Sequence, residues 1–164
     1  MEIRHPIHPD HGKALDTQGL RREFLITDLF SAGSIKLVYS HFDRIIVGGA
    51  VPTSARLPLE VEKSVIGTDH LLDSRELGVI NLGGDGSAVV DGEEYPLARL
   101  DALYVGRGSK SVAFSSRSAA SPAKFYLLSG IAHRELPTKR IGRGEAKQIV
   151  AGSAAQCNRR TIYQ

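Results

Sequence analysis

Sulfur and long apolar runs are scarce in this chain. Its single cysteine, Cys157, can form neither an intrachain disulfide nor a cysteine-based metal site, which fits a reducing compartment. The N-terminus, MEIRHPIHPDHGK, lacks the apolar segment of a signal peptide, and the longest apolar run, IIVGGAV, is far too short to cross a bilayer. We therefore expect a soluble, cytoplasmic protein with no membrane partner.

Positive charge is concentrated near the C-terminus. Residues 134–160 carry seven Lys or Arg against Glu135 and Glu145, whereas the net charge of the whole chain is only +3. A basic segment can contact nucleic acid, but this one lacks the interleaved aromatic residues that stack on bases, so no nucleic-acid partner is predicted. Its Gly, Ala and charged residues are typical of a linker, and we interpret residues 134–164 as a connector.

Two glycine-rich segments raise the question of phosphate binding. The first lies within INLGGDGSAVVDGEEYPL (80–97), and the second is GRGSKS (106–111). A phosphate-binding glycine loop runs into a helix whose N–H groups hold the anion, but a short β-prone run follows Gly86. GRGSKS has no Lys directly after its last glycine. We predict that both segments are hairpin turns.

Short apolar runs separated by Gly, Asp or Ser fill the middle of the chain. Their length and near-regular spacing, with no helical period between them, indicate a sandwich or barrel. A length of 164 residues with 41% apolar content suits one domain with a sizeable core. We predict an all-β domain over residues 34–133, preceded by an arm (1–33) with one short helix near Thr17–Glu23 that Thr17 caps.

One spacing within the β region resembles the first metal-binding motif of cupins, which are small β-barrels. That motif reads H-x-H, three or four residues, E, six residues and G, and places two His on alternate residues of one strand so that both point inward. His70, Glu76 and Gly83 match it here, but Leu72 stands at the second His position. The resemblance therefore implies a cupin scaffold with an incomplete ligand set.

The second cupin motif leads to the same conclusion. Asp101 and Gly108 agree with it, whereas Ser111 stands at the position of the last His ligand. His70 and Glu76 alone cannot complete a zinc site, which needs at least three protein ligands, so we expect neither a metal nor a catalytic residue in this chain.

Structural roles are the favoured interpretation of the two remaining ligand-type residues. We expect His70 to hydrogen-bond to backbone and Glu76 to pair with Arg75 or Arg99. The mouth of such a barrel still forms a pocket, which could bind a small anionic sugar acid without a metal.

Three histidines, His5, His8 and His11, stand three residues apart near the N-terminus. Pro6 and Pro9 argue against a regular helix, whereas a polyproline-type arm would align the three rings on one side and could bind a metal. The alternative, which we favour, is a flexible or docked arm whose imidazoles only titrate near neutral pH.

Six blocks spread along the chain resemble, in order, the N-terminal half of the 5-keto-4-deoxyuronate isomerase family. They are LDTQGLRREFL (15–25), VYSHFDRIIVGG (38–49), RELGVINLGG (75–84), DALYVGRG (101–108), SPAKFY (121–126) and NRRTI (158–162). The resemblance implies a hexameric two-cupin enzyme of pectin and uronate breakdown that interconverts 5-dehydro-4-deoxy-D-glucuronate and 3-deoxy-D-glycero-2,5-hexodiulosonate. It also implies a zinc ion, bound by three His and one Glu in a second cupin that this chain does not contain.

Two hypotheses about function follow from these observations. In the first, the chain is the N-terminal half of this ketol-isomerase and serves as scaffold and contact surface in a homo-oligomer. In the second, it is a self-standing, metal-free cupin that binds a sugar acid or acts in assembly. A reading frame that continues past codon 164 into H-x-H, a Glu and a later His would favour the first hypothesis.

Overall fold

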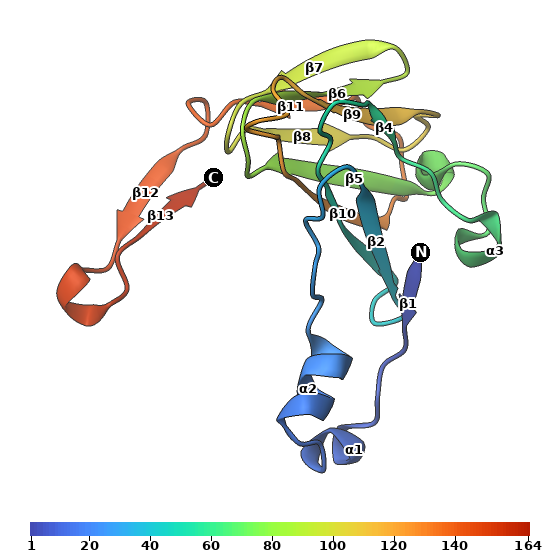
Figure 1. Ribbon diagram of the computed structural model, residues 1–164, viewed down its shortest axis with the longest axis vertical. Helices are drawn as coiled ribbons and strands as arrows, with labels where there is room; N and C mark the ends of the chain where they lie inside the picture. Colours follow the sequence, from blue (N-terminus) through green and yellow to red (C-terminus); the bar gives the residue numbers. More distant parts are fainter.

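Two β-sheets face each other in the computed structural model, which describes residues 1–164 (Figure 1). The larger sheet has seven strands, in the order β1 (Glu2–Arg4), β2 (Ile35–Ser40), β3 (Ile45–Ala50), β10 (Phe125–Ile131), β5 (Arg75–Asn81), β8 (Ala102–Val105) and β11 (Lys139–Ile141). The smaller sheet has four, in the order β4 (Leu57–Pro58), β9 (Val112–Ser116), β6 (Gly86–Val90) and β7 (Glu93–Leu97).

The sheets form an open sandwich rather than a closed barrel. All neighbouring strands run antiparallel except β1 and β2, and no strand of one sheet pairs with a strand of the other. The predicted all-β fold is thus confirmed as a sandwich, and closure into a barrel is not found. Strand β1 lies in the segment that was predicted to be an arm, and it adds an edge strand to the larger sheet.

Helices are few and short. They are α1 (Pro9–Lys13), α2 (Thr17–Phe24), α3 (Lys63–Ile66) and the 3₁₀ turns η1 (Leu71–Asp73) and η2 (Ala154–Gln156). The predicted helix near Thr17–Glu23 is confirmed as α2, but its cap is Asp16, whose Oδ1 accepts a hydrogen bond from the Gly19 N–H at 2.7 Å. Thr17 is already the first helical residue. None of the helices is both long and apolar enough to span a membrane.

Apolar side chains from both sheets fill the space between them. Along β5, Leu77 and Val79 are buried, while the alternating residues Glu76, Gly78 and Ile80 are more exposed, as the two-residue period of a strand requires. At the centre, the rings of Phe114 on β9 and Phe125 on β10 lie 5.1 Å apart, and both residues are fully buried. Eighteen buried residues form this continuous core.

The two glycine-rich segments connect the sheets and are not hairpins. Residues 82–85 lead from β5 in the larger sheet to β6 in the smaller, and residues 106–111 lead from β8 to β9 in the same way. Gly84 is required at the first crossing, because a Cβ there would lie 2.1 Å from the Ser121 carbonyl oxygen. The tight hairpin is at Asp91 and Gly92, between β6 and β7, where both residues have positive φ.

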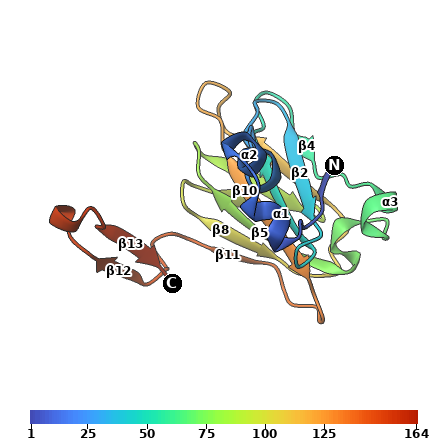
Figure 2. The same ribbon diagram turned by 90° about the horizontal axis from the view of Figure 1, so that it is seen from below.

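Another hairpin leaves the sandwich near the C-terminus. Its strands, β12 (Gln148–Ala151) and β13 (Arg160–Tyr163), pair only with each other and project to one side (Figures 1 and 2). This C-terminal hairpin lies within the segment that the sequence indicated as a connector.

Candidate functional site

The four cupin ligand positions do not converge on one point. Leu72, in η1, is 2% exposed and belongs to the core, whereas His70 directly before η1 is exposed. Glu76 alternates with the inward-pointing Leu77 along β5, so its side chain lies on the opposite face of the sheet from the core. His70, Leu72 and Ser111 therefore lie near one another at one end of the sandwich. Glu76 lies on the side of the larger sheet that faces away from the core.

Glu76 is held by a tyrosine and not by an arginine. The Tyr104 hydroxyl, on the neighbouring strand β8, donates a hydrogen bond of 2.7 Å to Glu76 Oε2. Burial and this contact with Glu76 raise the pKa of Tyr104. The expected ion pair with Arg75 or Arg99 is wrong, because Arg75 points into the protein and Arg99 makes no ion pair.

His70 and Ser111 also have structural surroundings. His70 and Asp73 form a capping box at the start of η1: the His70 N–H donates to Asp73 Oδ2 at 3.1 Å, and the His70 side chain faces the Asp73 N–H, which agrees with the predicted contact between His70 and backbone. Both the N–H and the hydroxyl of Ser111 donate to Asp91 Oδ1, at 2.8 and 3.3 Å. The carboxylate of Asp91 thus orders the turn in which Ser111 stands at the position of a cupin's last His ligand.

A shallow groove of about 390 Å³ lies beside these residues. His70, Leu72 and Ser111 line it together with Lys110 and residues 58–61. Lys110 pairs with Asp73 at 2.6 Å, and the hydrogen bond from this ammonium lowers the pKa of the Asp73 carboxyl. The groove combines the Lys110 ammonium, the His70 imidazole and apolar side chains, which can bind a sugar acid, with the carboxylates of Glu60 and Asp69, which oppose an anionic ligand.

The residues at the ligand positions do not fit a zinc ion. Zinc takes at least three His, Cys, Asp or Glu side chains in tetrahedral geometry, and no such group of three exists in the chain. The interior where a cupin metal would lie is occupied by the apolar core. No chemical step through a metal can be derived from these residues.

The N-terminal histidines do not share one side of an extended arm. His5 stacks on His41 with ring centroids 4.4 Å apart, and the His8 side chain accepts a hydrogen bond from the Asp10 N–H as the cap of α1. Helix α1 forms despite Pro9, because proline is tolerated at the first helical position. The polyproline arrangement is therefore wrong, and the arm is docked at His5.

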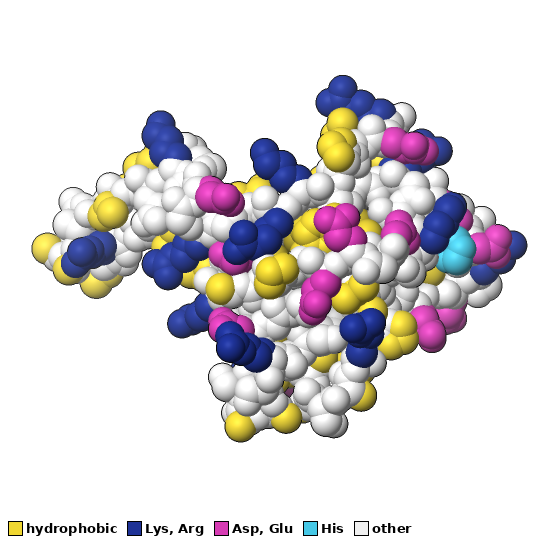
Figure 3. Space-filling model, turned by 90° about the horizontal axis from the view of Figure 1, so that it is seen from above, with side chains coloured by type: hydrophobic (Ala, Val, Ile, Leu, Met, Phe, Trp, Pro, Cys, Tyr) yellow, Lys and Arg dark blue, Asp and Glu magenta, His cyan; other side chains and the backbone are white.

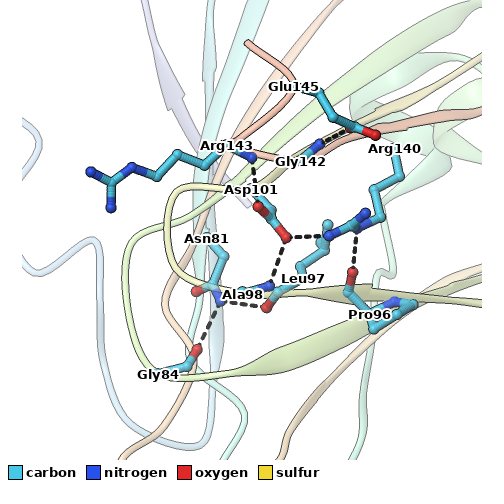
Figure 4. A network of polar contacts seen from close by, with 10 residues as sticks. All are labelled: Asn81, Gly84, Pro96, Leu97, Ala98, Asp101, Arg140, Gly142, Arg143 and Glu145. Atoms are coloured by element: carbon cyan, nitrogen blue, oxygen red, sulfur yellow. Dashed lines mark hydrogen bonds and ion pairs between the residues drawn. The ribbon is translucent and has the colours of Figure 1, made fainter. Parts of the chain in front are cut away.

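A polar network around Asp101 attaches the C-terminal segment to the sandwich (Figure 4). The Asp101 carboxylate accepts hydrogen bonds from Arg140 Nη2 at 2.6 Å, from the Arg143 N–H at 2.8 Å and from the Ala98 N–H at 3.0 Å. Burial alone would raise the pKa of Asp101, but these three donors outweigh it and hold the pKa below its usual range. The sequence marked Asp101 only as part of a cupin motif and gave it no partner.

Asn81 organises the crossing beside this network and was missed by the sequence analysis. Its Nδ2 donates to the carbonyls of Gly84 and Leu97, both at 2.8 Å, and its Oδ1 accepts from the N–H groups of Gly83 and Lys124. All donor and acceptor groups of this fully buried amide are used. Its only sequence signal is a polar residue at an inward position of an apolar strand.

Similarity to solved structures concerns the fold alone. An IolB-like protein from Salmonella typhimurium LT2 has a TM-score of 0.54 at 13% identity, covering 73% of this chain and 43% of that one. An RmlC-like cupin protein from Desulfovibrio desulfuricans has a TM-score of 0.43 at 16% identity, covering 59% and 80%. The likeness to the IolB-like protein shows a shared fold, and the mostly β sandwich agrees with the predicted fold class.

Sequence comparison is more specific, although no protein-family model matches the chain. The 4-deoxy-L-threo-5-hexosulose-uronate ketol-isomerase of Yersinia pestis (strain Pestoides F) is 51% identical over 164 residues, covering 99% of this chain and 59% of that protein. The protein of the same name from Salmonella agona is 47% identical over 165 residues, with the same coverage. Over 99% of its length the chain is therefore similar to these ketol-isomerases, and it spans 59% of theirs.

Proposed function

We propose that this chain is the structural half of a zinc-dependent cytoplasmic ketol-isomerase. The enzyme interconverts 5-dehydro-4-deoxy-D-glucuronate and 3-deoxy-D-glycero-2,5-hexodiulosonate in pectin and uronate breakdown. The observation that carries the proposal is 51% identity, over 99% of the chain, to proteins named for the ketol-isomerase. In this proposal the zinc and the catalytic residues belong to a second, C-terminal cupin outside residues 1–164.

The chemistry of the reaction supports this division of roles. An aldose–ketose shift moves a proton between adjacent carbons through an enediolate, which needs a base and a group that stabilises the developing negative charge. In this half, Leu72 is apolar and buried, Ser111 is bound to Asp91, and Glu76 is bound to Tyr104 on the outer face. This half therefore acts as scaffold, and its positive charge favours an anionic uronate at long range.

A second candidate function rests on the groove beside His70. Its volume of about 390 Å³ lies in the range of small-molecule sites, and Lys110 places an ammonium group at its edge. A self-standing cupin of this kind would bind a sugar acid without transforming it.

Turnover and metal content, measured together, test the proposed function. Residues 1–164 are purified and assayed on 5-dehydro-4-deoxy-D-glucuronate, with zinc measured in the same sample, and the complete reading frame is treated in parallel as the control. We expect neither turnover nor stoichiometric zinc in residues 1–164, and both in the complete reading frame. Turnover by residues 1–164 alone would overturn the proposal. The second candidate would be favoured by two results together: residues 1–164 bind a sugar acid and Lys110→Ala abolishes this binding, and the protein encoded by the complete reading frame shows no turnover.

A further inference from the structure

The C-terminal hairpin depends on few contacts for its direction. Its strands β12 and β13 pair only with each other, and the strand before them, β11, pairs with β8 over three residues. In the view from above, the hairpin is the lobe at the left, with Lys and Arg side chains on it and near its base (Figure 3). The direction of this lobe is therefore set in residues 142–147, between β11 and β12.

Apolar packing does not hold the base of the hairpin tightly against the sandwich. A pocket of about 420 Å³ lies between them, lined by Ile80, Leu82 and Ala102 on one side and by Ala146 and Tyr163 on the other. Side chains that border such a space lack the close contacts of a packed core on that side. Polar contacts therefore have the larger part in determining where the hairpin points.

One line of polar contacts runs from the sandwich to the last strand of the hairpin. The Asp101 carboxylate, whose side chain is 6% exposed, accepts a hydrogen bond from the Arg143 N–H at 2.8 Å. The Arg143 side chain donates from Nε to the Tyr163 hydroxyl at 3.0 Å, and its guanidinium lies over the Tyr163 ring at 5.4 Å. A single residue thus connects Asp101 to β13.

The turn that carries Arg143 is fixed on both sides of this contact. Before it, Arg140 donates from Nη2 to the same Asp101 carboxylate at 2.6 Å and from Nε to the Pro96 carbonyl at 2.7 Å. After it, the Glu145 carboxylate accepts a hydrogen bond from the Gly142 N–H and closes the turn. The donors around Asp101 hold its pKa below the usual range, so the carboxylate stays charged near neutral pH and keeps its contacts.

We propose that Asp101 is a positioning residue, which fixes the direction of the C-terminal hairpin through Arg143 and Tyr163. Its consequence for the reaction rests on the proposed function, in which the catalytic cupin lies outside residues 1–164. A scaffold acts through the position in which it holds the catalytic half, and a misplacement of about 1 Å can already lower the rate of an enzyme strongly. Asp101 then affects catalysis without touching substrate or metal.

Distances between two spin labels test the positioning role in residues 1–164, without substrate and independently of the isomerase assignment. One label is attached to Cys157, the only cysteine, which is exposed at the tip of the hairpin, and the other to Ser115→Cys on β9. We expect one narrow distance distribution for this protein, and broader or shifted distributions when Asp101→Asn or Arg143→Ala is added. Glu94→Gln, on the exposed face of β7, is the control and leaves the distribution unchanged. Circular dichroism and thermal unfolding check that all variants are folded.

Turnover by the complete reading frame tests the consequence for the reaction. We expect Asp101→Asn to lower kcat about tenfold or more, with a smaller change in KM and with the zinc content of the wild type. An inactive wild type would count against the proposed function and not against the positioning role, which the distances decide on their own. An active wild type whose Asp101→Asn variant keeps its kcat would overturn the consequence for the reaction.

Two results of the distance measurement would overturn the positioning role itself. One is a folded Asp101→Asn or Arg143→Ala variant with the distance distribution of the wild type. The other is a broad distribution in the wild type, which would mean that the hairpin has no fixed direction. If Asp101→Asn does not fold, Arg143→Ala decides, because it leaves the Asp101 carboxylate and the backbone N–H of residue 143 in place.

Discussion

At the scale of single residues, Asp101 joins the C-terminal segment to the sandwich. Its carboxylate accepts three hydrogen bonds, two of them from Arg140 and Arg143. The variant Asp101→Asn keeps the shape but replaces one acceptor oxygen by a donor. We expect urea unfolding at neutral pH to give a free energy of unfolding that is about 1–3 kcal/mol lower. Glu94→Gln, on the exposed face of β7, is the control and is expected to change it by less than about 0.5 kcal/mol.

The pH dependence of stability follows from the same carboxylate. Because the pKa of Asp101 is lower in the folded protein, its contribution is fully present above the unfolded pKa of about 4 and is lost as the pH falls through the folded value. The wild type should therefore lose more stability than Asp101→Asn between neutral pH and pH values below about 4. Parallel curves of unfolding free energy against pH for the two proteins would contradict this assignment.

Arg75 shows how a buried charge is accommodated without a carboxylate. It is 4% exposed, donates hydrogen bonds to the carbonyls of Ser129 and Arg44, and lies over the ring of Tyr39 at 5.4 Å. Burial lowers the pKa of this guanidinium. We expect Arg75→Lys to reduce the free energy of unfolding by about 1–3 kcal/mol, because an ammonium group cannot reach both carbonyls and stack on the ring. Chemical denaturation measures this change. An unchanged denaturation midpoint would show that stability does not depend on the two hydrogen bonds and the ring contact of the guanidinium group.

At the scale of elements, the connections between the sheets depend on glycine. In Gly84→Ala the new methyl group would meet the Ser121 carbonyl 2.1 Å away, so the crossing from β5 to β6 has to shift. We expect a loss of about 2–4 kcal/mol in unfolding free energy. Gly144→Ala is the matched control, since a Cβ there has no atom within 4 Å, and it should be nearly neutral. Thermal unfolding of the two variants side by side makes the comparison, and equal effects would contradict it.

The sequence predicted these elements better than their connections. Short apolar runs separated by turn residues indicated the strands, and the helix expected near Thr17–Glu23 is α2. Turn residues, however, show only that the chain changes direction and not which sheet it enters, so two crossings were mistaken for hairpins. Asp16 and Thr17 are both good capping residues, and only the backbone of the folded chain distinguishes them. The sequence was sufficient to predict that the Glu76 side chain points away from the core, because Leu77 and Val79 fix which residues of β5 face the core.

At the scale of the whole molecule, the C-terminal hairpin shares no strand pairing with the sandwich, although Tyr163 borders a pocket with Ile80 and Ala102. Strands β12 and β13 pair only with each other, and the Arg143 side chain bonds the Tyr163 hydroxyl at 3.0 Å within the same segment. Removing residues 146–164 should therefore shift the thermal midpoint by no more than about 2–4 °C, because a hairpin of this size contributes little on its own. Differential scanning calorimetry at low concentration measures this. A drop of more than about 10 °C would mean that the hairpin is part of the cooperative unit.

What the sequence could not supply at this scale is the relation between distant segments. Asp101 was marked by its motif and Arg140 by the basic stretch, but nothing in their spacing of 39 residues joined them. The spacing of the three histidines in the arm suggested that their rings could lie on one side of a polyproline-type helix. In the fold, the ring of His5 instead stacks on that of His41, which is far along the chain. Such pairings arise from the packing of the whole chain, and a local pattern does not contain them.

The order of strands in the larger sheet has a consequence for synthesis of the protein on the ribosome. Strands β3 and β5 are joined only through β10, which lies between them in space but is made last of the three. Between the end of β5 at Asn81 and the end of β10 at Ile131, 50 more residues must be added. At about 5–20 residues per second, this takes roughly 2.5–10 s, during which β3 and β5 both lack the neighbour that β10 provides, and β5 also lacks β8 until Val105 is made. Nascent-chain protection against aggregation should therefore matter most in this interval, before the strand that closes the sheet emerges.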